Sequence, residues 1–109
     1  MDNEFVLEIN GVNYRFKLKS QKIVALEKAF GKNIFDIFAD MTAGTLATVL
    51  KAALIEPENV DEFELLDIML TKYTLLELPS KVLNPIAVKS GLIKQQTMED
   101  MINENDAKN

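Results

Sequence analysis

The feature that most constrains the fold is the dipeptide Asn10-Gly11, which separates two segments of alternating apolar and polar residues. Residues 5–9 and residues 12–18 both have the period of two that a half-buried β-strand requires. Asn and Gly both accept positive φ, as a two-residue type I′ turn demands. The sequence therefore predicts an N-terminal β-hairpin.

The two-residue turn also fixes the register of the hairpin. On one face it predicts three apolar pairs, namely Phe5 with Phe16, Leu7 with Tyr14, and Ile9 with Val12. On the other face we expect Glu4 to pair with Lys17 as a cross-strand charge pair. An isolated hairpin is marginally stable in water, so the rest of the chain has to cover its apolar face.

The segments after the hairpin have the periodicity of short amphipathic helices. We expect helices at about 21–30 after a cap at Ser20, 34–41 after a cap at Asn33, 46–55 after a cap at Thr45, 61–74, and 85–102 after a cap at Asn84. Gly31 is expected to end the first helix in the left-handed conformation, and breaks are expected at Pro79 and Pro85. The predicted fold class is therefore α+β, an N-terminal β-hairpin followed by four to six short packed α-helices.

The chain shows no internal repeat and no linker rich in Gly, Ser or Pro. Its 109 residues suit one domain. We expect residues 1–97 to form a single α+β domain and residues 98–109 to form a C-terminal tail that is frayed or disordered. The sequence has no long apolar run and an acidic start, which predicts a cytosolic protein without a membrane partner.

The composition argues against several kinds of chemistry. The chain has no Cys and no His, so it lacks the thiol nucleophile, the commonest general base and the commonest transition-metal ligands. Its four glycines are isolated, which excludes a phosphate-binding glycine loop. The acidic residues between 56 and 67 lack the spacing of a calcium loop. We therefore expect no enzyme activity, cofactor, metal or small-molecule substrate.

The net charge of −5 is unevenly distributed along the chain. Residues 1–32 contain six basic and four acidic side chains, whereas residues 56–77 contain seven acidic side chains and one basic. The overall acidity opposes binding to nucleic acid. The simpler interpretation is a pair of solvated faces of opposite sign. The alternative is a homo-oligomer that associates head to tail, basic end to acidic middle.

Five apolar residues are candidates for binding a partner. Phe35 lies opposite the apolar stripe of its short helix, so that helix is either buried on all sides or part of an interface. Leu50 lies in the most apolar predicted helix, and together with Phe35 it marks the alternative partner-binding site. Met98, Met101 and Ile102 form a sparse stripe, typical of a frayed end but also of a helix that binds in a groove.

The order of these elements resembles a known family. FVLEINGVNYRF at residues 5–16, IVALEKAFG at 23–31, a short aromatic helix and LATVLKAAL at 46–54 resemble the tail assembly chaperones of long-tailed bacteriophages and prophages. The chain is also similar to the small tail protein of that kind in gene transfer agents. The resemblance covers about residues 4–75, and the two proline breaks depart from it.

The resemblance implies a non-enzymatic chaperone in the cytoplasm of the bacterial host that is absent from the mature virion. Such chaperones bind the tape measure protein and recruit tail tube protein subunits, and many are also made as a longer frameshifted product. One alternative is a structural tail component, a tube or tail completion protein retained in the virion. A second is a regulatory DNA-binding module, which the single basic residue of the most apolar helix, Lys51, argues against.

Overall fold

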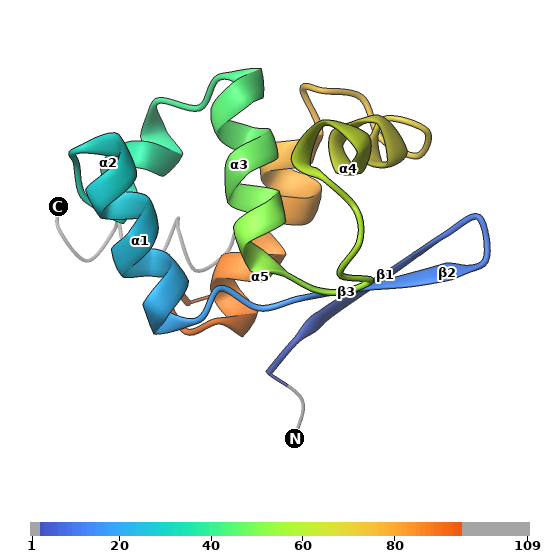
Figure 1. The fold of residues 1–109 in the computed structure, drawn as a ribbon, viewed down its shortest axis with the longest axis horizontal. Coiled ribbons are helices and arrows are strands. Elements are labelled where there is room, and N and C mark those ends of the chain that lie inside the picture. The colour runs from blue at the N-terminus through green and yellow to red at the C-terminus, as the bar shows by residue number, and fades with distance from the viewer. Residues whose placement is uncertain (1–2, 95–109) are drawn as a thin grey trace, which may run out of the picture.

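The computed structural model describes residues 3–94, which form a three-stranded antiparallel sheet and five α-helices (Figure 1). This confirms the predicted α+β class. The elements in chain order are β1 (Phe5–Ile9), β2 (Val12–Phe16), α1 (Ser20–Phe30), α2 (Ile34–Ala39), α3 (Ala43–Ala53), β3 (Leu54–Glu56), α4 (Glu62–Met69), the π-helical segment η1 (Pro79–Leu83) and α5 (Asn84–Lys89). No helix of this described part is both long and apolar enough to cross a membrane.

The hairpin has the predicted register, with Phe5 opposite Phe16, Leu7 opposite Tyr14, and Ile9 opposite Val12. Asn10 and Gly11 have φ angles of 54° and 80°, as the predicted turn requires. Of the six residues on the apolar face, four are buried, Phe5 is partly buried and Val12, beside the turn, is exposed. The rest of the chain therefore covers most of this face.

The predicted charge pair between Glu4 and Lys17 is wrong, because Glu4 pairs with Arg15 instead. The Arg15 guanidinium donates from Nε to Oε1 of Glu4 at 2.8 Å and from Nη2 to Oε2 at 2.9 Å. Two parallel bonds of this kind fit a guanidinium better than a single ammonium group. Arg15 also pairs with Glu56 of β3, so one side chain links all three strands across the exposed face of the sheet.

Helices α1 and α2 lie close to their predicted positions. Gly31 ends α1 in the left-handed conformation, with φ 69°. The Asn33 side chain accepts a hydrogen bond from the backbone N–H of Asp36 and so caps α2, as predicted. The predicted cap at Ser20 is wrong, since Ser20 is already helical and Lys19 is the cap residue.

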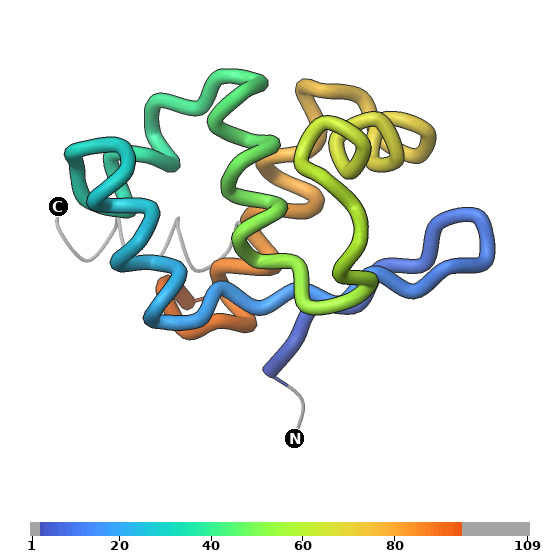
Figure 2. Tube along the Cα trace, in the orientation of Figure 1, coloured from blue at the N-terminus to red at the C-terminus, as the bar shows by residue number. Residues whose placement is uncertain are grey.

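Helix α3 begins and ends earlier than predicted. Thr42, and not Thr45, is its cap residue, and the Thr42 side chain accepts a hydrogen bond from the Thr45 N–H. The helix ends at Ala53, and the next three residues form β3, which pairs with β2 (Figure 2). The apolar pattern continues through Leu54 and Ile55, so periodicity alone extended the helix through this strand.

The predicted helix 61–74 is shorter in the structure. Asp61 caps α4 by accepting a hydrogen bond from the Glu64 N–H. The helix ends at Met69, with Leu65 and Met69 on its buried side, and the next residue, Leu70, is exposed.

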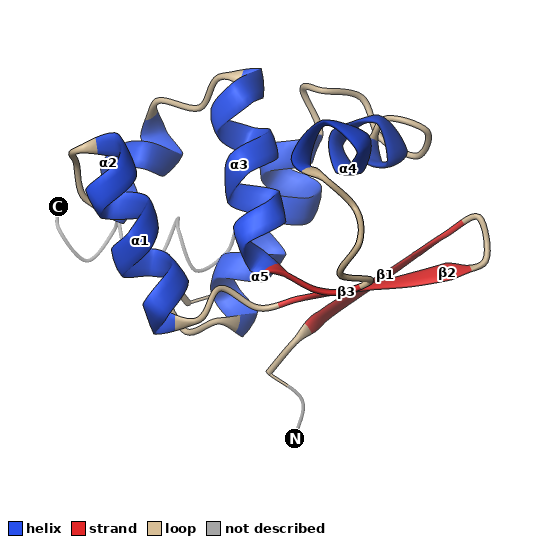
Figure 3. Ribbon diagram, in the orientation of Figure 1, coloured by secondary structure: helices blue, strands red, loops and turns tan. Residues whose placement is uncertain are grey.

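The predicted break at Pro85 is wrong, because η1 and α5 follow one another without a gap (Figure 3). The break predicted at Pro79 lies earlier in the chain, between the end of α4 at Met69 and the start of η1 at Pro79. Pro79 stands in the first turn of η1, where a missing N–H costs no helical hydrogen bond. Pro85 stands in the first turn of α5, but Leu83 and Asn84 before it are already helical, so no break separates the two segments. Asn84 is helical, and its N–H bonds to the carbonyl of Pro79 across a wide turn. The helix predicted to reach residue 102 ends at Lys89, and the predicted tail 98–109 lies outside the described residues.

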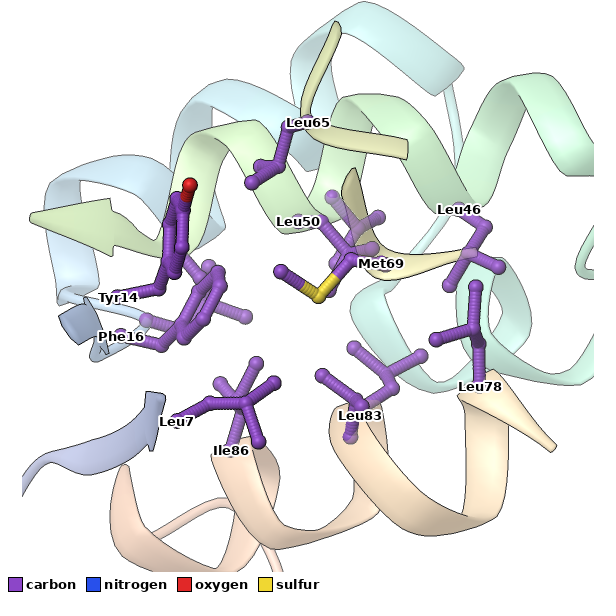
Figure 4. Packing of buried hydrophobic residues seen from close by; sticks show 14 of the residues in the cluster. Leu7, Tyr14, Phe16, Leu46, Leu50, Leu65, Met69, Leu78, Leu83 and Ile86 are labelled. Atoms are coloured by element: carbon purple, nitrogen blue, oxygen red, sulfur yellow. The ribbon is translucent and has the colours of Figure 1, made fainter. Parts of the chain in front are cut away.

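The core lies where the sheet, α3, α4 and the η1–α5 stretch meet. Figure 4 shows Leu7 and Phe16 from the sheet, Leu50 from α3, Met69 from α4 and Ile86 from α5 directed into this interior. All five side chains are buried, and no polar or charged side chain of residues 3–94 is buried among them. This arrangement fixes both ends of α3 relative to the sheet.

Candidate partner-binding hollows at the two ends of helix α3

The part of the chain that the structure describes contains no cluster of three or more acidic residues placed to hold a metal ion. Its surface hollows include one at each end of α3. We name the first the apolar hollow and the second the lysine hollow, after the residues that line them.

The apolar hollow lies at the start of α3 and has a volume of about 400 Å³. Its lining residues are Met41, Thr42, Ala43, Leu46, Leu75, Leu76 and Pro79. One wall is therefore the loop and first turns of α3, and the other is the connection between α4 and η1. Most of the surface inside it is nonpolar, which suits an apolar side chain of a partner.

A pair of reciprocal hydrogen bonds holds Leu75 and Leu76 in place. The Thr74 N–H donates to Oε1 of Glu77 at 2.9 Å, and the Glu77 N–H donates to Oγ1 of Thr74 at 3.2 Å. These two bonds form a capping box around the two leucines between them. The hydrogen bond from the Thr74 backbone lowers the pKa of the Glu77 carboxyl below its ordinary value. The Glu77 carboxylate thus stabilises the turn that presents both leucines.

Leu76 is 90% exposed and Leu75 is also exposed. A single exposed leucine is ordinary on a protein surface. Two adjacent leucines fixed at the rim of an apolar hollow form a continuous nonpolar surface, which is typical of a binding site. Sequence reasoning missed this site, although the capping-box pattern Thr-x-x-Glu at residues 74–77 was a readable signal for the turn.

The lysine hollow lies at the other end of α3 and has a volume of about 320 Å³. Its lining residues are Lys17, Lys19, Lys22, Lys51, Ala52, Ala53, Leu54, Ile55 and Glu58. The lysines come from the end of β2, the start of α1 and the last turn of α3. A hydrogen bond of 2.9 Å from the Lys17 N–H to the Ala53 carbonyl joins two of these walls.

The four lysines form no ion pair with any residue between 3 and 94. Lys51 donates from Nζ to the backbone carbonyl of Glu58 at 3.0 Å, and this is a contact with a neutral group. The ion pairs of the described residues join Arg15 to Glu4 and Glu56 and Lys32 to Asp40. The lysine hollow is therefore a concave surface with an excess of positive charge.

The structure separates the five residues that the sequence singled out for partner binding. Phe35 is 54% exposed on α2, so the expectation that this helix is buried on all sides is wrong. Phe35 lines neither hollow. Leu50 is fully buried on the core side of α3, so its proposed contact with a partner is corrected to a role in packing. Met98, Met101 and Ile102 lie outside the described residues.

The sequence matches no model of a known protein family, and no similar curated protein or solved structure was found. The two hollows therefore have to be interpreted from the geometry of this chain.

Proposed function

We propose that the protein is a non-enzymatic tail assembly chaperone that binds an amphipathic helical segment of the tape measure protein in the apolar hollow. The observation that carries the proposal is the exposed pair Leu75 and Leu76, fixed by a capping box at the rim of a nonpolar hollow of about 400 Å³. The resemblance of residues 4–75 to tail assembly chaperones supplies the class of client.

A helical client fits this surface for physical reasons. An amphipathic helix presents apolar side chains at intervals of three and four residues, and one such side chain can enter the hollow while its neighbours contact the rim. Full burial of a leucine contributes roughly 1.5–3 kcal/mol. Covering Leu75 and Leu76 therefore provides a driving force for binding that does not depend on charge.

In this proposal the protein acts in the cytoplasm of the bacterial host. It keeps the long client chain from aggregating, recruits tail tube protein subunits to it, and is absent from the mature virion. A role of this kind requires exposed binding surfaces and no catalytic residue.

The test is co-expression of the full chain with the tape measure protein of the same gene cluster, followed by capture of the complex. We expect the double variant Leu75→Ser, Leu76→Ser to bind the client at least about tenfold more weakly, since each 1.4 kcal/mol lost is a factor of ten in affinity. The matched control is Val6→Ser with Val12→Ser, which removes two exposed valines from the hairpin. The control should bind normally, and both variants should keep the melting temperature of the wild type.

Equal client capture by the double variant and the control would contradict this assignment of the site. Loss of capture in Phe35→Ser alone would move the site to α2. Detection of the protein in purified virions, at the stoichiometry of a tail subunit, would instead favour a structural tail component.

A further inference from the structure

The lysine hollow carries an inference that is independent of the client. Several ammonium groups share this concave surface, and like charges close together repel. A partner with carboxylates at the rim would relieve this repulsion. Beneath the lysines the lining includes Ala52, Leu54 and Ile55, so the hollow offers nonpolar contact as well. Its volume of about 320 Å³ is at the lower end of the range for ligand pockets, which suits an inserted side chain.

The outward face of α4 has the complementary chemistry. Leu65 and Met69 point into the core, whereas Phe63 is 67% exposed. Phe63, Asp67 and Leu70 are spaced four and three residues apart, so they lie along one side of the helix. Glu64 is the neighbouring exposed carboxylate. Neither Glu64 nor Asp67 forms an ion pair within residues 3–94.

We infer that the lysine hollow binds the outward face of α4 from a second copy of this chain, with Phe63 inserted and Glu64 and Asp67 paired with the lysines. Charge complementarity selects this occupant, because the chain carries both halves of the contact. Aromatic anchors surrounded by polar and charged contacts are typical of interface centres. The contact joins two different surfaces, so it is heterologous, and its repetition generates a ring or a filament.

The contact uses no lining residue of the apolar hollow, because neither the lysine hollow nor the set Phe63, Glu64 and Asp67 shares a residue with it. Each copy in an oligomer therefore still presents Leu75 and Leu76. The proposed contact between copies can therefore be tested separately from the proposed client site.

The experiment uses charge-reversed variants of the full chain in sedimentation velocity over a range of concentrations. The first variant is Lys19→Glu with Lys22→Glu, and the second is Glu64→Lys with Asp67→Lys. Wild type should associate at low salt and dissociate at about 1 M salt, where the Debye length is about 3 Å. Each variant alone should associate at least about tenfold more weakly than wild type. A mixture of the two should regain association, since both of its junctions join opposite charges.

Two further variants separate the contributions of charge and nonpolar contact. Lys28→Glu with Lys89→Glu, a control with the same change in net charge outside the hollow, should associate like wild type. Phe63→Ser should weaken association without changing its dependence on salt. Regained association in the mixture also shows that both reversed chains fold.

Three results would overturn the inference. The first is a wild-type chain that stays monomeric at low salt and high concentration. The second is association that survives both reversals, or a mixture that stays monomeric. The third is association that is lost on removal of residues 95–109 but unchanged by the reversal of Glu64 and Asp67, because the acidic C-terminal segment would then be the occupant.

Discussion

The two ends of α3 are built by different kinds of contact. At its start, Thr42 caps the helix through a residue three positions away, and the facing wall is held by the capping box of Thr74 and Glu77. At its end, Ala53 accepts a hydrogen bond from the Lys17 N–H, and the chain continues into β3, where Glu56 pairs with Arg15, a residue 41 positions away. The first end is held by local contacts and the second by the sheet.

This difference indicates how each hollow should respond to a substitution. The hydrogen bonds that hold the walls of the apolar hollow close over short stretches of chain, so a substitution there should loosen this end of α3 without disturbing the sheet. The lysine hollow is joined to β3 and to the end of β2, and the hydrogen bond from Lys17 to Ala53 holds two of its walls together. A charged surface held in this way suits one defined partner, such as another copy of the same chain.

The largest expected effect is a loss of stability that affects both ends of α3, and it comes from a substitution in the middle of that helix. Leu50→Ala should lower the free energy of unfolding by about 2–5 kcal/mol, because Leu50 is fully buried and its loss leaves a cavity. Chemical denaturation measures this. A variant of normal stability that no longer captures the client would instead place Leu50 in the binding site.

The next effect distinguishes the two ends. Gly11→Val should lower the free energy of unfolding by about 1–3 kcal/mol, because valine is strained at the Gly11 φ of 80° although its Cβ would meet no atom within 4 Å. Amide hydrogen exchange should become faster first in β3 and at Lys17, since β3 pairs with β2 and Lys17 directly follows β2. Asn13→Val, an exposed strand position, is the control and should be nearly neutral. An unchanged melting temperature in Gly11→Val would refute the type I′ turn.

A smaller loss of stability is expected at the start of α3, beside the apolar hollow. Thr42→Ala removes the side-chain cap of α3 and should cost about 1 kcal/mol, within a range of about 0.5–2 kcal/mol. Hydrogen exchange should quicken near Leu46 and stay unchanged in β3. Thr71→Ala is a suitable control because the exposed Thr71 hydroxyl donates to the Ile68 carbonyl at the end of α4 and forms no hydrogen bond with α3. Equal quickening at both ends of α3 would show that the two ends are not independent.

The same distinction between local and distant contacts explains what the sequence predicted. The hairpin register followed from Asn10-Gly11 and the alternation around it, and both are local. Strand β3 was missed because Leu54 and Ile55 continue a helical pattern, whereas the strand partners of Leu54 and Glu56 lie about forty positions away. Pro85 lies in the first turn of the last helix, as the sequence predicted, but the helical segment η1 leads directly into it where a break was expected.

The candidate sites were less predictable than the fold. The sequence shows that residues 1–32 are rich in lysine, but only the packing of α3 against the sheet brings Lys51 beside Lys17 and Lys22. The capping box of Thr74 and Glu77 could be read directly. The exposure of Leu76 could not, because it depends on where α4 ends and η1 begins.

The smallest expected effect is a response to pH that differs between the two ends. The hydrogen bonds from Arg15 lower the pKa of Glu4 from its ordinary value of 4.5, and the bond from the Thr74 backbone lowers that of Glu77. A lowered pKa means that each carboxylate favours the folded state at pH values above 4.5. This contribution is lost as the pH falls below 4.5 through the pKa of the folded protein.

Two substitutions assign the response to one end or the other. In Glu4→Gln, hydrogen exchange in β3 should become less dependent on pH, while exchange at Leu75 and Leu76 keeps its wild-type pH dependence. In Glu77→Gln, the reverse should hold, because glutamine keeps an acceptor oxygen for the Thr74 N–H but carries no charge to titrate. The stability difference from wild type should be largest above pH 4.5 and decrease as the pH falls through the pKa of the folded protein. A change that appears at both ends in either variant would mean that the local and sheet-bound ends of α3 respond as one unit.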